Sequence, residues 1–214
     1  MRDYILAAAA ALAMTGAATA APEPEDPAKQ TSWGLYLTAE EAYEMETSRP
    51  DEVLFVDVRE PVEIMFTGFT DVVDVNIPFL LVDPSRMHES KPVLAMERNP
   101  DFADEVLAAL EAQGLDRSAP VILMCRSGGS RGAPSAATLE GLGLEEVYVV
   151  VDGFQGTTAS DNPNGPRRVV DGWMNLATTE SDVELQPWVY TVARLEGLAV
   201  VLWVLAAGRG GDNE

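Results

Sequence analysis

Residues 121–132 decide the fold class, and they run Val121-Ile122-Leu123-Met124-Cys125-Arg126-Ser127-Gly128-Gly129-Ser130-Arg131-Gly132. The first four residues are apolar, too few for a helix and rich in branched side chains, which is typical of a buried strand. A short turn containing glycines follows, and residues 133–142 then have a helical pattern. This order predicts a strand of an open α/β sheet with Cys125 at its carboxyl end.

Cys125 is the candidate nucleophile. Ligands of open α/β sheets bind at the carboxyl ends of strands, where turn N–H groups and the next helix attract anions. Arg126 and Arg131 add positive charge, which favours the thiolate over the thiol. A structural thiol would instead have apolar neighbours. Because Cys125 is the only cysteine, it has no partner for a disulfide or a CxxC pair, and a second thiol must come from another molecule.

Helical and strand patterns alternate through the rest of the central region. Thr38-Ala39-Glu40-Glu41 is a capping box that opens a helix to about Thr47, and residues 99–113 form an amphipathic helix that ends at Gly114. Strands are expected at the following ranges: residues 53–56, 72–78, 121–124 and 147–151. Such alternation predicts an α/β fold, a parallel sheet with helices on both faces. Residues 157–168 are expected to be a long surface loop, and Trp173 a core residue.

The amino terminus has the pattern of a secretory signal peptide. A short charged head and an apolar, alanine-rich stretch precede Ala18-Thr19-Ala20, an A-x-A-like cleavage site. We therefore expect export to the periplasm, with cleavage after about Ala20. Residues 21–34 are expected to be a linker, in which residues 22–29 have the Pro, Glu and Asp content of disordered chain.

These pieces together resemble the rhodanese family. The resemblance covers about residues 35–176, and five motifs carry it: Asp57-Val58-Arg59-Glu60-Pro61-Val62-Glu63, Asn76-Ile77-Pro78, Cys125-Arg126-Ser127-Gly128-Gly129, Val151-Asp152-Gly153-Phe154 and Asp171-Gly172-Trp173. It implies a rhodanese-like α/β domain in which Cys125 accepts a sulfane sulfur from a donor such as thiosulfate and passes it, as a persulfide, to an external thiol or other acceptor. Substrate-binding roles are implied for these residues: Asp57, Arg59, Arg126, Ser127, Gly128, Gly129, Ser130 and Arg131. Within that set, Arg59 would help to hold the anionic donor and Asp57 would orient Arg59 or the loop.

The cysteine loop also departs from the family pattern. Single-domain relatives often have Cys-Arg-Ser-Gly-x-Arg-Ser, whereas this chain has Ser130-Arg131 at the last two positions. The exchange creates Cys-x5-Arg, the spacing of cysteine-dependent phosphatases and arsenate reductases on a rhodanese-like fold. Met124 stands where those enzymes have histidine, and the loop has no acid to protonate a leaving group. Sulfur transfer is therefore favoured, with the phosphatase or arsenate reductase and a non-catalytic binding module as alternatives.

Charge and composition restrict the partners. The net charge of −21 argues against nucleic acid and anionic membranes, and no motif indicates a metal or a cofactor. The partners expected are a small anionic sulfur donor and an external sulfur acceptor. Residues 177–214 are expected to form a helical extension. Arg194 and Glu196 interrupt its apolar part, which favours packing on the domain or on a second protomer over a membrane anchor.

The signal peptide gives the first prediction. We expect the protein recovered from a periplasmic fraction to begin at Ala21, because cleavage follows small residues at the A-x-A-like site. Amino-terminal sequencing and intact mass measure this directly. A periplasmic or membrane-bound protein that still begins at Met1 would contradict it.

Overall fold

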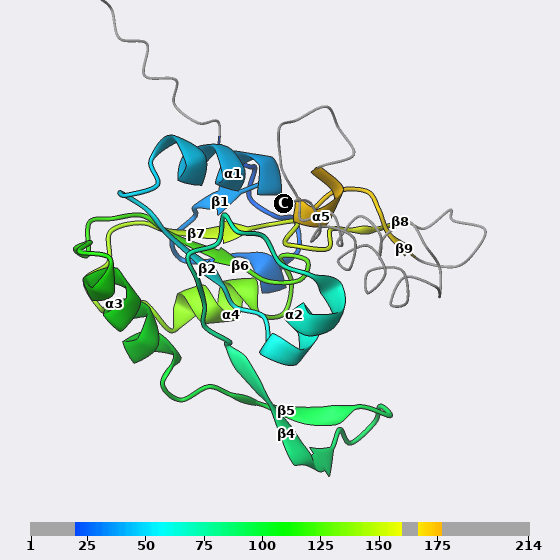
Figure 1. Cartoon of the computed structure of the whole chain (residues 1–214). Coiled ribbons are helices and arrows are strands. Elements are labelled where there is room, and N and C mark those ends of the chain that lie inside the picture. Colours follow the sequence, from blue (N-terminus) through cyan, green and yellow to red (C-terminus); the bar gives the residue numbers. More distant parts are fainter. Residues whose placement is uncertain (1–19, 160–166, 177–214) are drawn as a thin grey trace, which may run out of the picture.

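The computed structural model describes residues 20–159 and 167–176. Its centre is a parallel sheet of five strands in the order β1-β7-β6-β2-β3 (Figure 1). The strands are β1 (Tyr36–Leu37), β2 (Leu54–Asp57), β3 (Val75–Asn76), β6 (Val121–Met124) and β7 (Val147–Val150). All residues of β2 and β6 are buried, which explains why β6 and residues 54–56 of β2 are continuous apolar runs rather than alternating ones.

Helices cover both faces of this sheet, as the alternating pattern predicts. On one face α1 (Ala39–Ser48) and the short α5 (Trp173–Leu176) pack over side chains such as Phe55 and Ile122. On the other face lie α3 (Phe102–Ala112) and α4 (Gly132–Ala137), below the strands in Figure 1. The expected fold class is therefore confirmed. Trp173 is fully buried against Tyr43 and Phe55, so its prediction as a core residue is also confirmed.

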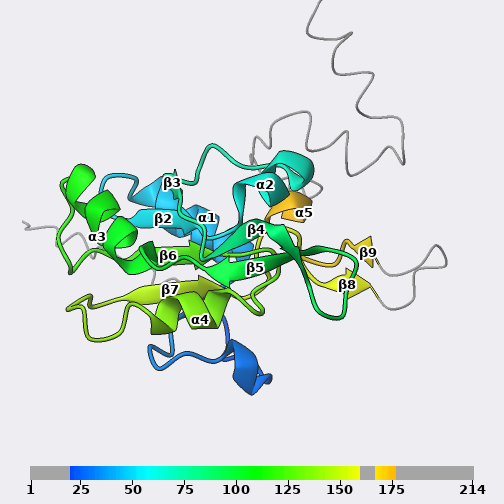
Figure 2. The same cartoon turned by 90° about the horizontal axis from the view of Figure 1, so that it is seen from below.

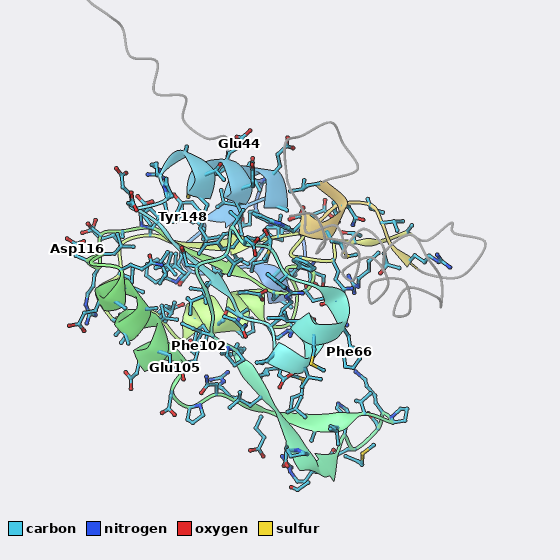
Figure 3. All side chains as sticks on the ribbon, viewed as in Figure 1. Glu44, Phe66, Phe102, Glu105, Asp116 and Tyr148 are labelled. Atoms are coloured by element: carbon cyan, nitrogen blue, oxygen red, sulfur yellow. The ribbon has the colours of Figure 1, made fainter. Side chains whose placement is uncertain are left out.

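Two helix starts follow from local sequence. The capping box of α1 is present, since the Thr38 side chain accepts from the Glu41 N–H and the Glu41 carboxylate accepts from the Thr38 N–H. The helix α2 (Pro61–Thr67) begins with Pro61 at its first turn, and the Glu60 carboxylate accepts from the Val62 N–H. Figure 3 shows Phe66 on the outer side of α2, where it is 71% exposed.

Four segments differ from the sequence predictions. The third strand is confined to Val75–Asn76 instead of residues 72–78. Residues 80–98, for which no element was predicted, form an antiparallel hairpin of β4 (Leu80–Met87) and β5 (Leu94–Arg98) that projects beside α2 (Figures 1 and 2). Part of the expected loop at 157–168 is also paired, as β8 (Thr158–Ala159) with β9 (Arg167–Arg168). The helix expected at 133–142 is shorter, Gly132–Ala137.

The disorder expected near the amino terminus is wrong for residues 22–29. Pro27–Lys29 form a 3₁₀ helix capped by Asp26, and the Ala21 N–H donates to the Tyr36 carbonyl. Further along, Trp33 Nε1 donates to the Ala136 carbonyl of α4, so this segment packs on the domain. Residues 1–19 of the expected signal peptide and residues 177–214, the expected helical extension, lie outside the described residues. Within the described part of the chain, no helix is long and apolar enough to cross a membrane.

A buried acid lies at the amino edge of the sheet, opposite Cys125. Glu46 on α1 is 4% exposed, and its Oε2 atom has no hydrogen-bond partner among the described residues. Burial, and then the nearby charge of Asp74, raise the pKa of Glu46 to about 8. Glu46 is therefore protonated at neutral pH in the folded protein.

The raised pKa of Glu46 predicts a pH-dependent stability. The folded chain holds this proton up to about pH 8, whereas the unfolded chain loses it near the ordinary value of 4.5, so stability from this group is lost as pH rises between them. Neutral Glu46→Gln should match the wild type near about pH 5 and have a higher free energy of unfolding at about pH 9. Denaturant titrations at both pH values measure this. The exposed Glu44→Gln on the same helix, labelled in Figure 3, is the control and should show no such crossover. Equal stability of Glu46→Gln and wild type at the higher pH would contradict the assignment.

Candidate active site

Two glycine turns interlock where β6 and β7 end. Gly128 has a φ of 63°, and a Cβ atom there would lie 1.8 Å from the Val151 carbonyl oxygen. Gly153 also has a φ of 63°, and a Cβ atom there would lie 2.5 Å from both the Cys125 carbonyl oxygen and the Ser127 nitrogen. Only glycine fits either position, because both the space and the backbone angle exclude a side chain. The turn after Cys125 is therefore fixed by backbone contact with the turn after β7.

Hydrogen bonds orient the peptide groups of the cysteine loop. The Cys125 carbonyl accepts from the Phe154 N–H at 2.8 Å, and the Arg126 carbonyl accepts from the Gln155 N–H at 2.7 Å. In contrast, the N–H groups of residues 126–131 donate to no acceptor in the part of the chain that the structure describes. The loop thus has its first two carbonyls engaged, while its N–H groups have no acceptor among the described residues, which is the arrangement of an anion-binding turn.

The Cys125 thiol is buried rather than exposed at the surface. The residue is 2% exposed and lies at the edge of the core cluster that α3 and α4 cover. A Cβ atom on Gly132, the first residue of α4, would lie 3.8 Å from the thiol sulfur, so the sulfur sits beside the start of that helix. Of the loop residues expected to bind a substrate, Gly128 is buried, Ser127 and Gly129 are half-buried, and Arg126 and Ser130 are exposed.

Arg59 lies close to the loop, but it is fully buried and its donors are used within the protein. Its Nε and Nη2 atoms donate to the Asp57 carboxylate, Nη1 donates to Thr67 Oγ1, and Nη2 also donates to the Gly68 carbonyl. Its guanidinium packs on the Phe154 ring at 3.8 Å from the ring centroid. Asp57 therefore orients Arg59, as expected. The contact expected between Arg59 and a donor stays a prediction, and the position of this side chain does not favour it.

Arg131 is also paired with a carboxylate. Its Nη1 and Nη2 atoms donate to Glu63 of α2 at 2.5 and 3.0 Å, a bidentate ion pair whose two side chains are 10% and 19% exposed. Such pairing neutralises the charge of Arg131 and joins α4 to α2 across the mouth of the site. Glu63 belongs to a motif of the sequence analysis, but its partner was not predicted because the two residues lie far apart along the chain.

Asp152 connects three elements beside the cysteine loop. Its Oδ1 atom accepts from the Ala39 N–H at the start of α1, and Oδ2 accepts from the Gly172 N–H just before α5. Burial raises the pKa of Asp152 to about 6, although these N–H donors act in the opposite direction. This aspartate is thus a structural link between the end of β7 and the starts of α1 and α5.

The chain is similar to a known family and to solved structures. A model of the rhodanese-like domain matches residues 38–160, more than half of the chain. The chain belongs to the rhodanese family. No curated protein matches it. Its rhodanese domain is similar to the crystal structure of Rv0390 from M. tuberculosis, with 28% identity, coverage of 64% of this chain and 89% of that chain, and a TM-score of 0.42. It is also similar to the solution structure of the 30 kDa polysulfide-sulfur transferase homodimer from Wolinella succinogenes, with 23% identity, coverage of 59% and 71%, and a TM-score of 0.38.

The rhodanese domain brings one further arginine to the site that the sequence analysis did not assign. Arg168 of β9 lies within electrostatic range of Cys125 and Arg126. No local signal marks it, because it is the last residue of the polar segment 157–168 that was expected to be a surface loop. Among the described residues, no group of three or more His, Cys, Asp or Glu residues is arranged to hold a metal.

The glycine interlock predicts unequal costs for the same substitution. Gly153→Ala should lower the free energy of unfolding by about 1 to 3 kcal/mol more than Gly141→Ala, because both have positive φ but only Gly153 meets neighbouring backbone. Chemical denaturation of the two variants measures the difference. Gly141→Ala is a matched control, since it has a φ of 75° and nothing within 4 Å of an added Cβ. Equal losses in the free energy of unfolding would show that backbone strain alone destabilises both variants and that the turns do not interlock.

Proposed function

We propose that this protein is a sulfurtransferase that moves a sulfane sulfur from an anionic donor such as thiosulfate to a thiophilic acceptor through a persulfide on Cys125. The observation that carries the proposal is the loop itself: a cysteine at the carboxyl end of β6, followed by N–H groups that have no acceptor among the described residues. Membership of the rhodanese family supports it. The retained cysteine argues against a purely non-catalytic binding module.

Sulfur transfer takes place in two displacements at Cys125. In the first, the thiolate attacks the outer sulfur of thiosulfate, an S–S bond forms to the protein, and sulfite leaves with the electron pair of the broken S–S bond. The proton of the resting thiol goes to solvent. In the second, the thiolate of an external acceptor attacks the outer sulfur of the persulfide, and the Cys125 thiolate is released. The N–H groups of residues 126–131 suit the negative charge on the persulfide, because they supply donors without adding a titratable group.

The position of Arg131 supports phosphatase or arsenate reductase chemistry less well than sulfur transfer. In the Cys-x5-Arg alternative, this arginine would hold the tetrahedral oxyanion bidentately, but here its fork is occupied by Glu63. Glu63 does place a carboxylate near the site. Both of its oxygens accept hydrogen bonds from Arg131, so this carboxylate is engaged in the ion pair and is not placed to protonate a leaving group.

We also propose that the protein works after export, with residues 1–20 removed as a signal peptide and residues 177–214 as a helical extension. The sequence pattern described above supports both. In that setting the donor is a small anion and the acceptor is an external thiol or another sulfur acceptor. A resolving thiol must come from another molecule, because the chain has no second cysteine.

Replacing the nucleophile tests the proposal. Cys125→Ser should abolish sulfur transfer from thiosulfate to cyanide or a dithiol while leaving the melting temperature close to that of the wild type, since serine is nearly the same size. Parallel assays with an aryl phosphate measure the alternative activity. Wild-type release of phosphate without sulfur transfer, lost in Cys125→Ser, would reverse the assignment. Sulfur transfer that persists in the variant would remove Cys125 from the mechanism.

A further inference from the structure

The arginines around Cys125 divide into two groups. Arg59 and Arg131 are each in an ion pair with a carboxylate, Asp57 and Glu63 respectively, so neither adds uncompensated charge to the site. Arg126 and Arg168 are different, because no carboxylate in the described part of the chain lies within ion-pair distance of either side chain. The positive charge available to a ligand at this site therefore comes from Arg126 and Arg168.

Arg168 is held beside the cysteine loop by backbone contacts. Its Nη1 atom donates to the Gly156 carbonyl at 2.5 Å, and the neighbouring Gln155 N–H donates to the Arg126 carbonyl at 2.7 Å. Two adjacent residues, Gln155 and Gly156, and two short hydrogen bonds thus connect the guanidinium to the loop that follows Cys125. The first of these bonds uses one of the five N–H donors of the guanidinium.

A second set of contacts keeps this segment in place. The Asp171 carboxylate accepts from the Thr157 N–H and, at 3.0 Å, from Thr157 Oγ1. Gly156 and Gly172 approach so closely that a Cβ atom on Gly172 would lie 2.2 Å from the Gly156 nitrogen. These contacts connect the ends of the β8–β9 pair to the start of α5. Arg168, which lies in β9, is therefore held in position.

The charges of the two free arginines act on one another. Burial, and then repulsion by Arg126, lower the pKa of Arg168 from its ordinary value, while Cys125, Asp171 and Glu63 act in the opposite direction. Two like charges at one opening repel in the empty site, and an anion between them relieves that repulsion while gaining charge-assisted hydrogen bonds. The surrounding protein has a net charge of −21, so this local positive pair is the feature that attracts an anion to the recessed thiol.

We propose that Arg168 is a substrate-binding residue, which with Arg126 binds the oxyanion end of a sulfur donor at the mouth of the Cys125 loop and selects dianionic donors over neutral ones. This inference rests on the proposed sulfur transfer and assigns to Arg168 the role that the sequence suggested for Arg59.

Alkylation of Cys125 tests the anion site independently of sulfur transfer. Iodoacetate and iodoacetamide both alkylate a thiolate with loss of iodide, and they differ chiefly in charge. On the full-length chain, Arg168→Gln should lower the ratio of the iodoacetate rate to the iodoacetamide rate by about tenfold, the value of one charge-assisted hydrogen bond. Because Cys125 is the only cysteine, intact mass reports a single site.

Arg167→Gln is the matched control. It removes the same charge from the adjacent residue of β9, whose side chain points to the opposite face of the strand. Its alkylation ratio should stay near the wild-type value. Equal losses in Arg167→Gln and Arg168→Gln would overturn the inference, because net charge alone would then account for both. An unchanged ratio in a folded Arg168→Gln would also overturn it.

Steady-state kinetics separates substrate binding from a structural role. Arg168→Gln should raise the KM for thiosulfate about tenfold with kcat within about twofold of wild type, and Arg168→Lys should recover much of the loss because it keeps the charge. A fall in kcat with unchanged KM would contradict the assignment. If circular dichroism shows that Arg168→Gln is unfolded, the alkylation ratio of Arg168→Lys decides the question. A ratio equal to that of the wild type supports the anion site. A ratio as low as that of the wild type at saturating salt overturns the inference. If no variant or wild-type protein transfers sulfur, the proposed function fails while the alkylation ratio still tests the anion site.

Discussion

Backbone contact between the turn at Gly128 and the turn at Gly153 is the constraint on which the rest of the site depends. Each turn occupies the space that a Cβ atom of the other would need, and two hydrogen bonds from Phe154 and Gln155 close the contact. These bonds take up the carbonyls of Cys125 and Arg126, whereas the N–H groups of the loop have no acceptor within residues 20–159 and 167–176. An anion-binding loop is therefore a consequence of how β6 and β7 end, and it requires no charged side chain.

The charged groups near Cys125 mainly support this backbone arrangement. Arg59 is held by Asp57 at the end of β2 and packs on the ring of Phe154, the residue whose N–H binds the Cys125 carbonyl. Breaking such a buried pair by removing one partner leaves an uncompensated charge, which is costly. Arg131 and Glu63 similarly tie α4 to α2 at the other side of the loop. Because each of these two ion pairs has no net charge, Arg126 and Arg168 at the opening are the side chains that select among sulfur donors.

The elements that could be predicted from the sequence are those whose signal is local. The capping box at Thr38, the apolar run at 121–124 and the glycines after Cys125 each act within a few residues, and the structure has the expected helix, strand and turn. The hairpin at 80–98 gave no such signal, because most of its side chains are exposed and do not alternate between core and solvent. Residues 22–29 have the composition of disordered chain, yet nearby contacts such as that of Trp33 with Ala136 join positions that only the fold brings together. For the same reason, the sequence identified Arg59 as a charge near the site but not its burial, and it gave no indication that Arg168 approaches the thiol.

The account is tested most directly by the mass of the intact protein after brief exposure to thiosulfate. If the loop holds Cys125 for sulfur transfer, the wild-type chain should gain the mass of one sulfur atom and lose it again on treatment with a dithiol or cyanide. Cys125→Ser, with the same fold, should gain nothing. A wild-type protein that stays unchanged in mass while its loop is correctly folded, or a serine variant that gains the same sulfur, would contradict the central claim that the interlocked turns hold Cys125 as a persulfide carrier.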